Sequence, residues 1–143
     1  MLRRSMVSAV MACVVLVGGV GGATSARTCW YPPVVGVVTD PFRAPACTWC
    51  AGNRGIEYRV GRDVDVRAAM SGVVTFVGTV AGTQYVVVRS PDGSRITYGR
   101  LRSAGAGAGD RVLAGTTIAR AGGEFFLGLR LGDDYVDPAP YIG

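Results

Sequence analysis

The sequence contains no histidine and no lysine among its 143 residues. Without an imidazole, the chain itself cannot supply the general base, proton shuttle or zinc ligand that histidine provides in many hydrolases. All 15 basic residues are arginine, and the 10 acidic residues leave a net charge of +5. Because this charge is modest and scattered along the chain, the composition does not favour a nucleic-acid-binding protein.

The sequence also lacks an unbroken apolar run long enough to span a membrane. Arg3 and Arg4 precede an apolar stretch over residues 6–20, which glycines interrupt and which falls short of the roughly 20 residues that a span requires. This pattern predicts a signal peptide over residues 1–26, cleaved after Ala26, although a retained anchor is the alternative. The mature segment, residues 27–143, has a length typical of a single domain and should have no membrane attachment after cleavage.

Cysteine is scarce in this mature segment, which contains Cys29, Cys47 and Cys50. In an exported protein two of the three can form a bridge. A bridge from Cys29 to either of the others would close a loop of about 20 residues and contribute on the order of 3 kcal/mol. The Cys-x-x-Cys spacing also matches a redox dithiol, but the flanking prolines and glycine disfavour the strand and helix that surround such a motif. A zinc ribbon, which needs four ligands, is disfavoured as well.

Helical periodicity is missing, and short runs rich in Val, Thr, Tyr and Phe alternate with Gly, Pro and Asp, so the sequence predicts an all-β domain. The expected strands are residues 34–39, 55–60, 65–68, 72–80, 84–89, 95–98, 116–119, 125–130 and 134–136. Between two of them, Pro91, Asp92 and Gly93 predict a hairpin turn, because proline presets φ and glycine accepts the left-handed position. The glycine-rich segment 103–109 lacks the lysine and the strand–helix setting of a phosphate-binding loop and is expected to be a flexible loop.

Six segments, taken in order, resemble the lysostaphin-type (LytM-like) zinc endopeptidases that cut peptidoglycan cross-bridges. The matching segments are residues 33–43, Asn53-Arg54-Gly55-Ile56-Glu57 in place of H-x-G-x-D, residues 66–74 for V-x-A-x-x-x-G-x-V, Thr97-Tyr98-Gly99-Arg100-Leu101 for T-Y-x-H-L, residues 108–115, and Glu124-Phe125-Phe126 for H-L-H, followed by Val136-Asp137-Pro138. The resemblance implies a small antiparallel β-sheet of the half-barrel sandwich (duplicated hybrid motif) type. It also implies a zinc cofactor in the family.

The resemblance fails at the positions that carry the family's chemistry. Its zinc-ligand positions are Asn53, Glu57 and Phe126 in this chain, and its two catalytic histidine positions are Arg100 and Glu124. A guanidinium cannot accept a proton at working pH, and a phenyl ring cannot coordinate a metal. Since a catalytic zinc needs about three protein ligands, no metal site, catalytic residue or cofactor is expected here.

The charged replacements raise the question of what the site does now. If the resembling fold holds, Arg54, Glu57, Arg100 and Glu124 converge, and Arg100 can pair with a carboxylate and tie neighbouring strands together, as a metal would. The alternative is that these charges are solvated and contribute about 0–1 kcal/mol. Trp49 and Tyr58, with Arg54 and Tyr98, are candidates for the walls of a binding groove, although most aromatic residues of such a domain pack in the core.

The function predicted from these observations is an exported, catalytically inactive, peptidoglycan-endopeptidase-like module. It would be a secreted or envelope-localised monomer, with cell-wall peptide or a cell-wall hydrolase as its partner. The alternatives are an active zinc endopeptidase with atypical ligands and a secreted interaction protein unrelated to the wall. The exclusive use of arginine and the abundance of Gly, Ala and Val are typical of a high-GC, actinobacterial source.

Overall fold

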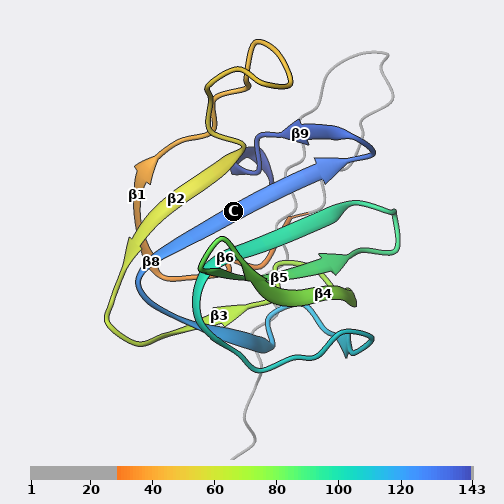
Figure 1. Ribbon diagram of the computed structural model, residues 1–143. Helices are drawn as coiled ribbons and strands as arrows, with labels where there is room; N and C mark the ends of the chain where they lie inside the picture. The colour runs from red at the N-terminus through yellow and green to blue at the C-terminus, as the bar shows by residue number, and fades with distance from the viewer. Residues whose placement is uncertain (1–28, 143) are drawn as a thin grey trace, which may run out of the picture.

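Short runs of β-branched and aromatic residues form nine strands in the described part of the chain, residues 29–142 of a computed structural model (Figure 1). The strands are β1 (Gly36–Asp40), β2 (Gly55–Val60), β3 (Val64–Arg67), β4 (Gly72–Val80), β5 (Thr83–Arg89), β6 (Arg95–Ala104), β7 (Arg111–Val112), β8 (Thr117–Leu131) and β9 (Asp134–Val136). One 3₁₀ turn, η1 (Ala139–Tyr141), follows them. The expected signal peptide, residues 1–26, lies outside the described residues. No helix within residues 29–142 is long and apolar enough to cross a membrane.

All strands belong to a single antiparallel sheet, with the order β1-β2-β8-β6-β5-β4-β7. Strand β8 is central to the sheet and pairs with four other strands. β2 and β6 flank it, and β3 and β9 pair with its two ends. In Figure 1, β3 lies beside the first part of β8, and β4 lies beside β5 on the side of the sheet away from β1. The predicted all-β class with antiparallel pairing is therefore confirmed.

Two predicted strand boundaries are wrong because the strands continue through irregular pairing. The segments 116–119 and 125–130 join into the single strand β8, and β6 continues past Tyr98 to Ala104. Gly122 and Gly123 lie at the irregularity, where Gly123 adopts φ +84° and donates a backbone hydrogen bond to the Gly61 carbonyl. These two glycines let one strand bend and continue where the sequence predicts two separate strands.

The glycine-rich segment that follows β6 is also held more firmly than expected. The N–H groups of Gly105 and Ala106 both donate to the carbonyl of Ile118, and the N–H of Gly109 donates to the carbonyl of Val74 at 2.7 Å. The segment 103–109 therefore contributes to the packing of the sheet and is not a loose loop.

The predicted hairpin turn between β5 and β6 is confirmed. Gly93 adopts φ +86°, and Ser90 exchanges backbone hydrogen bonds with residues 93 and 94. The Asp92 carboxylate accepts hydrogen bonds from the hydroxyl and the backbone N–H of Ser94, and these bonds lower the pKa of Asp92. This Asx-type arrangement fixes the register of β5 and β6 at the turn that joins them.

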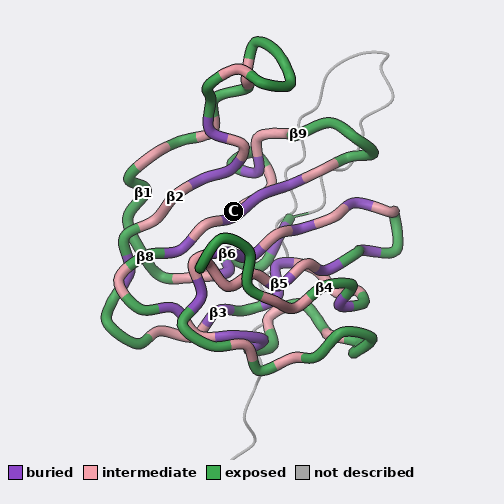
Figure 2. Tube along the Cα trace, viewed as in Figure 1, coloured by how far each residue is buried: buried purple, intermediate pink, exposed green. Residues whose placement is uncertain are grey.

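The core lies on the inner face of the curved sheet, where β2, β6 and β8 are most buried (Figure 2). Phe125, Leu127 and Leu129 of β8 point inward and are fully buried. Tyr98 is buried beside them, and its hydroxyl accepts a hydrogen bond of 2.8 Å from the backbone N–H of Ala69. At the ends of the described chain, the ring of Trp30 stacks on Tyr141 with 5.2 Å between centroids.

Candidate functional site

The strand alternation that buries Phe125 and Leu127 turns the residues between them to the outer face of β8. Glu124 and Phe126 therefore lie on the outer face. The register places Glu57 of β2 directly opposite Phe126, and Gly99 of β6 opposite it on the other side. Three strands thus bring together residues that are far apart in the sequence.

The ring of Phe126 lies over a floor made of glycines. A Cβ atom built on Gly55 would come within 2.5 Å of the ring, one on Gly99 within 3.2 Å, and one on Gly128 within 3.1 Å. The ring of Tyr85 from β5 covers Gly99 as well, at 2.6 Å from the same hypothetical atom. Each of these glycines leaves space that an aromatic ring occupies, so the position of a family zinc ligand is filled by a hydrocarbon side chain.

Arg100 reaches this outer face because the backbone is irregular at that point. It is a non-glycine residue with φ +56°, and the pairing of β6 with β8 shifts register next to it. Its guanidinium donates to the Glu57 carboxylate at 2.8 Å and to the Glu124 carboxylate at 3.3 Å. Arg100 thereby connects β2, β6 and β8. The left-handed conformation costs a side-chain-bearing residue roughly 1–2 kcal/mol. In this domain it occurs at the residue that forms both ion pairs.

A further ion pair, which the sequence reasoning missed, extends this group of charges to β1. Asp40 lies opposite Glu57 in the pairing of β1 with β2, and its carboxylate accepts hydrogen bonds from the guanidinium of Arg43. The hydrogen bond from Arg43 lowers the pKa of Asp40, and the charge of Arg100 acts in the same direction. The three-residue spacing of Asp40 and Arg43 was a signal available in the sequence.

Asn53 uses its amide to hold the base of the loop between β1 and β2. The residue is 6% exposed, and its Nδ2 donates to the carbonyls of Asp40 and Pro41 at 3.2 and 3.1 Å. Its Oδ1 accepts a hydrogen bond of 3.4 Å from the N–H of Gly55. The amide is therefore engaged with the backbone of its own loop.

The expected groove is not formed as predicted. Tyr98 is fully buried, and Tyr58 points to the inner face, where its ring packs against Phe125, so neither lies on the same face as Glu57. Burial also raises the pKa of Tyr58, since a phenolate would be poorly solvated there. The face on which Tyr58 of β2 and Tyr98 of β6 lie cannot be assigned before the register of these strands is known.

Arg54 and Trp49 also lie away from the charged group. The Arg54 guanidinium donates to the Thr48 carbonyl at 2.8 Å and lies over the ring of Tyr135, 5.5 Å from its centroid. Trp49 is 92% exposed on the loop between β1 and β2. Of the four residues expected to converge, the structure thus brings together Glu57, Arg100 and Glu124, and Arg54 stays with the loop.

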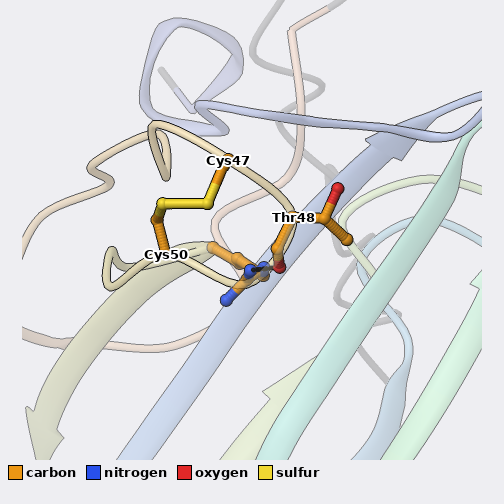
Figure 3. Close-up of a disulfide and its surroundings, with 4 residues drawn as sticks. Cys47, Thr48 and Cys50 are labelled. Atoms are coloured by element: carbon orange, nitrogen blue, oxygen red, sulfur yellow. Dashed lines mark hydrogen bonds between the residues drawn. A yellow bond between two sulfur atoms is a disulfide. The ribbon is translucent and has the colours of Figure 1, made fainter.

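The loop that carries Trp49 contains a disulfide, Cys47–Cys50 (Figure 3). Because this bridge occupies both sulfurs, the pairing that the sequence left open is Cys47 with Cys50, and a bridge from Cys29 to either of them is excluded in this structure. The chain-entropy relation gives a four-residue ring about 2 kcal/mol, less than the 20-residue loop would have contributed.

Beside Arg100, the surface has an open depression of about 390 Å³. Its walls combine β5, β6 and the bulge of β8, and the lining residues are Gly82, Thr83, Gln84, Arg100, Leu101, Gly122 and Glu124. Both charge signs and an amide side chain therefore face the same hollow. Such a mixture suits a polar ligand that carries donors and acceptors, such as a peptide backbone.

Residues 51–127, more than half of the chain, match the family described as Peptidase family M23. The chain belongs to peptidase family M23. This M23 domain has the fold of several solved structures. Helicobacter pylori Csd3 has a TM-score of 0.72 and 22% identity over 81% of this chain and 33% of Csd3. The catalytic domain of lysostaphin from Staphylococcus simulans has a TM-score of 0.64 and 16% identity over 74% and 91% of the two chains.

A third structural relative of the M23 domain is the SpoIIQ–SpoIIIAH pore-forming complex. Its matching chain has a TM-score of 0.71 and 19% identity, with 82% of this chain and 92% of that one covered. The chain spans about a third of the length of the Csd3 structures. The comparison with curated proteins found no matching sequence.

The residues of this M23 domain do not fit the zinc ion that the resemblance implies. Phe126 has no donor atom, the Asn53 amide bonds to its loop, and Glu57 is paired with a guanidinium. Within residues 29–142 no three His, Cys, Asp or Glu side chains are grouped so that they could hold a metal. One carboxylate beside a fixed positive charge is a poor site for a dication, which needs about three ligands.

Proposed function

We propose that this M23 domain is an exported, catalytically inactive module that acts in the cell envelope by binding a wall peptide or a wall-hydrolase partner. The observation that carries the proposal is the pairing of Arg100 with Glu57 and Glu124, beside the Phe126 ring that occupies a ligand position. The family scaffold is retained, while its metal-binding and proton-transferring groups are replaced.

The charges at the site support binding better than hydrolysis. Peptide hydrolysis needs a group that activates water and groups that stabilise the developing oxyanion. Arg100 cannot take a proton, and both of its carboxylate neighbours accept its hydrogen bonds. The same side chains can donate to and accept from a bound peptide without any chemical step.

The depression next to Arg100 gives such a ligand a place to bind. Glu124 keeps 69% of its side chain exposed and Arg100 keeps 38%, so both can contact a molecule in the hollow while paired with each other. Thr83 and Gln84 add neutral hydrogen-bonding groups. The presence of a chain with this fold in a pore-forming complex supports the view that the fold can serve in protein assembly.

The proposal is tested by pull-down of the purified protein with insoluble peptidoglycan and with envelope extracts. Retention by peptidoglycan, or capture of a wall hydrolase, is expected, and the double variant Arg100→Ala/Glu124→Ala should weaken it at least tenfold. Arg111→Ala, which removes an exposed arginine of β7, serves as the control. Absence of binding to both would overturn the proposal.

The alternative, a zinc endopeptidase with atypical ligands, is tested with the same preparation. It predicts one equivalent of zinc per chain and solubilisation of cell walls that a chelator abolishes. The inactive-module proposal predicts neither. N-terminal sequencing of the protein recovered outside the cell tests export, with processing after Ala26 as the expected result.

A further inference from the structure

The loop between β1 and β2 has a disulfide that the proposed function does not use. The base of the loop is held independently of this bridge: the backbones of Arg43 and Asn53 exchange two hydrogen bonds of 2.9 Å, and the buried Asn53 amide bonds to Asp40 and Pro41. The bridge itself closes a ring of only four residues. Its removal should therefore leave the sheet and the loop base in place.

The bridge is also accessible from solvent. Cys47 is exposed and Cys50 is half-buried, so an external thiolate can approach the Cys47 sulfur without any unfolding of the sheet. A disulfide is cleaved by such an attack, and exposed bridges are generally the labile ones.

A permanent positive charge is hydrogen-bonded to the backbone between the two cysteines. Between the cysteines, the carbonyl of Thr48 accepts the 2.8 Å hydrogen bond from the Arg54 guanidinium (Figure 3). A nearby arginine favours a thiolate over a thiol and so makes the departing sulfur a better leaving group. No helix follows Cys50 before β2 begins at Gly55, so the setting is not that of a thioredoxin-like oxidoreductase.

We propose that Cys47–Cys50 is a thiol-exchange site, at which the bridge opens by reaction with an external dithiol and closes by the reverse reaction with the corresponding disulfide, while the M23 domain stays folded. The dithiol's thiolate attacks the Cys47 sulfur, the S–S bond breaks, and Cys50 leaves as a thiolate. The second sulfur of the dithiol then displaces Cys47. The protein gains two electrons and, on protonation, two protons, and the dithiol becomes a disulfide.

The exchange changes the surface that the loop presents. Trp49 lies between the two cysteines and is almost fully exposed, whereas the other tryptophan, Trp30, is buried against Tyr141. Opening the bridge frees the backbone of residues 47–50 and with it the orientation of the indole. The site would thus couple the thiol environment to the shape of the most prominent aromatic contact on the loop.

The test measures the rate at which dithiothreitol reduces the bridge at increasing urea concentrations below the unfolding transition. The purified full chain with Cys13→Ala and Cys29→Ala is used, so that exchange is confined to the bridge. Local access predicts a rate that changes less than twofold per molar urea. Reduction through global unfolding predicts a rate that rises by about fivefold or more per molar, because urea lowers the free energy of unfolding linearly. The second result overturns the proposal.

Three further measurements identify the site, the state of the fold and the change at Trp49. With glutathione as the probe, the mixed disulfide trapped by alkylation should lie on Cys47, with Cys50 alkylated. The reduced protein and the variant Cys47→Ser/Cys50→Ser should keep the far-UV circular dichroism of the oxidised protein. Trp49 fluorescence should change on reduction, and Trp49→Phe should abolish that change. Loss of the fold on reduction would contradict the proposal, as would an adduct found only on Cys50.

Discussion

Replacement of Arg100 tests whether the charged group stabilises the sheet. The pair with Glu57 is partly buried, with 38% and 25% of the two side chains exposed, and should contribute about 1–1.5 kcal/mol, between an exposed pair and a buried charge-assisted hydrogen bond. The pair with the more exposed Glu124 adds about 0–0.5 kcal/mol. Arg100→Ala should therefore lower the free energy of unfolding by about 1–2 kcal/mol and the melting temperature by roughly 5–10 °C.

A second variant separates the ion pairs from the backbone conformation. Arg100→Gly loses the same ion pairs, but glycine accepts φ +56° without the penalty that alanine keeps. It should be more stable than Arg100→Ala by about 1 kcal/mol. Both variants are measured by urea denaturation, with m required to stay constant.

Either of two results would contradict a stabilising role of the Arg100 ion pairs. One is that Arg100→Ala destabilises the domain no more than Arg111→Ala, which removes an exposed arginine that forms no ion pair among the described residues. The other is a double-mutant cycle of Arg100→Ala with Glu57→Gln that gives no coupling energy, since residues in contact are expected to couple by at least about 0.5 kcal/mol.

Three other changes test the glycines under the Phe126 ring, the core and the absence of a metal. Gly55→Ala should cost about 2–3 kcal/mol, because its Cβ would meet the Leu127 carbonyl and the Phe126 ring; a loss below about 1 kcal/mol in urea denaturation would show that the floor can shift. Burial raises the pKa of Tyr98, so the stability linked to its neutral phenol is present below about pH 10 and is lost at higher pH. Tyr98→Phe should therefore reduce the loss of stability at alkaline pH. At pH 7 the same variant should cost about 1–3 kcal/mol, because the N–H of Ala69 loses its acceptor. Addition of EDTA should leave the melting temperature unchanged within about 1 °C, whereas a fall of several degrees would reveal a bound stabilising metal.

The sequence predicts local features well where one residue type determines the backbone. Gly93 had to accept a left-handed φ in the hairpin turn, and it does. The composition of the runs also predicts the strand class and several boundaries, such as Gly72–Val80. The union of residues 116–119 and 125–130 in one strand was not predicted, because the glycines at 122–123 permit both a turn and a bulge, and only pairing with neighbouring strands decides between them.

The site was predictable in its residues but only partly in its geometry. The resemblance identified Glu57, Arg100 and Glu124, and the structure brings these together. The faces of Tyr58 and Tyr98 depend on register, which no single strand specifies. The cysteine pairing depends on how far the loop brings Cys29 from the others, so the sequence left it open.

The central position of β8 has a consequence for any molecule that binds at the charged face. Glu124 and Phe126 belong to a strand that is hydrogen-bonded along its length to four others, so these two residues cannot separate from the sheet unless its pairing breaks. Local opening at this point should have a free energy close to that of global unfolding, and the amides of β8 should be among the slowest to exchange with solvent. An incoming ligand therefore meets a prearranged surface, and most of the entropy lost on binding comes from the ligand.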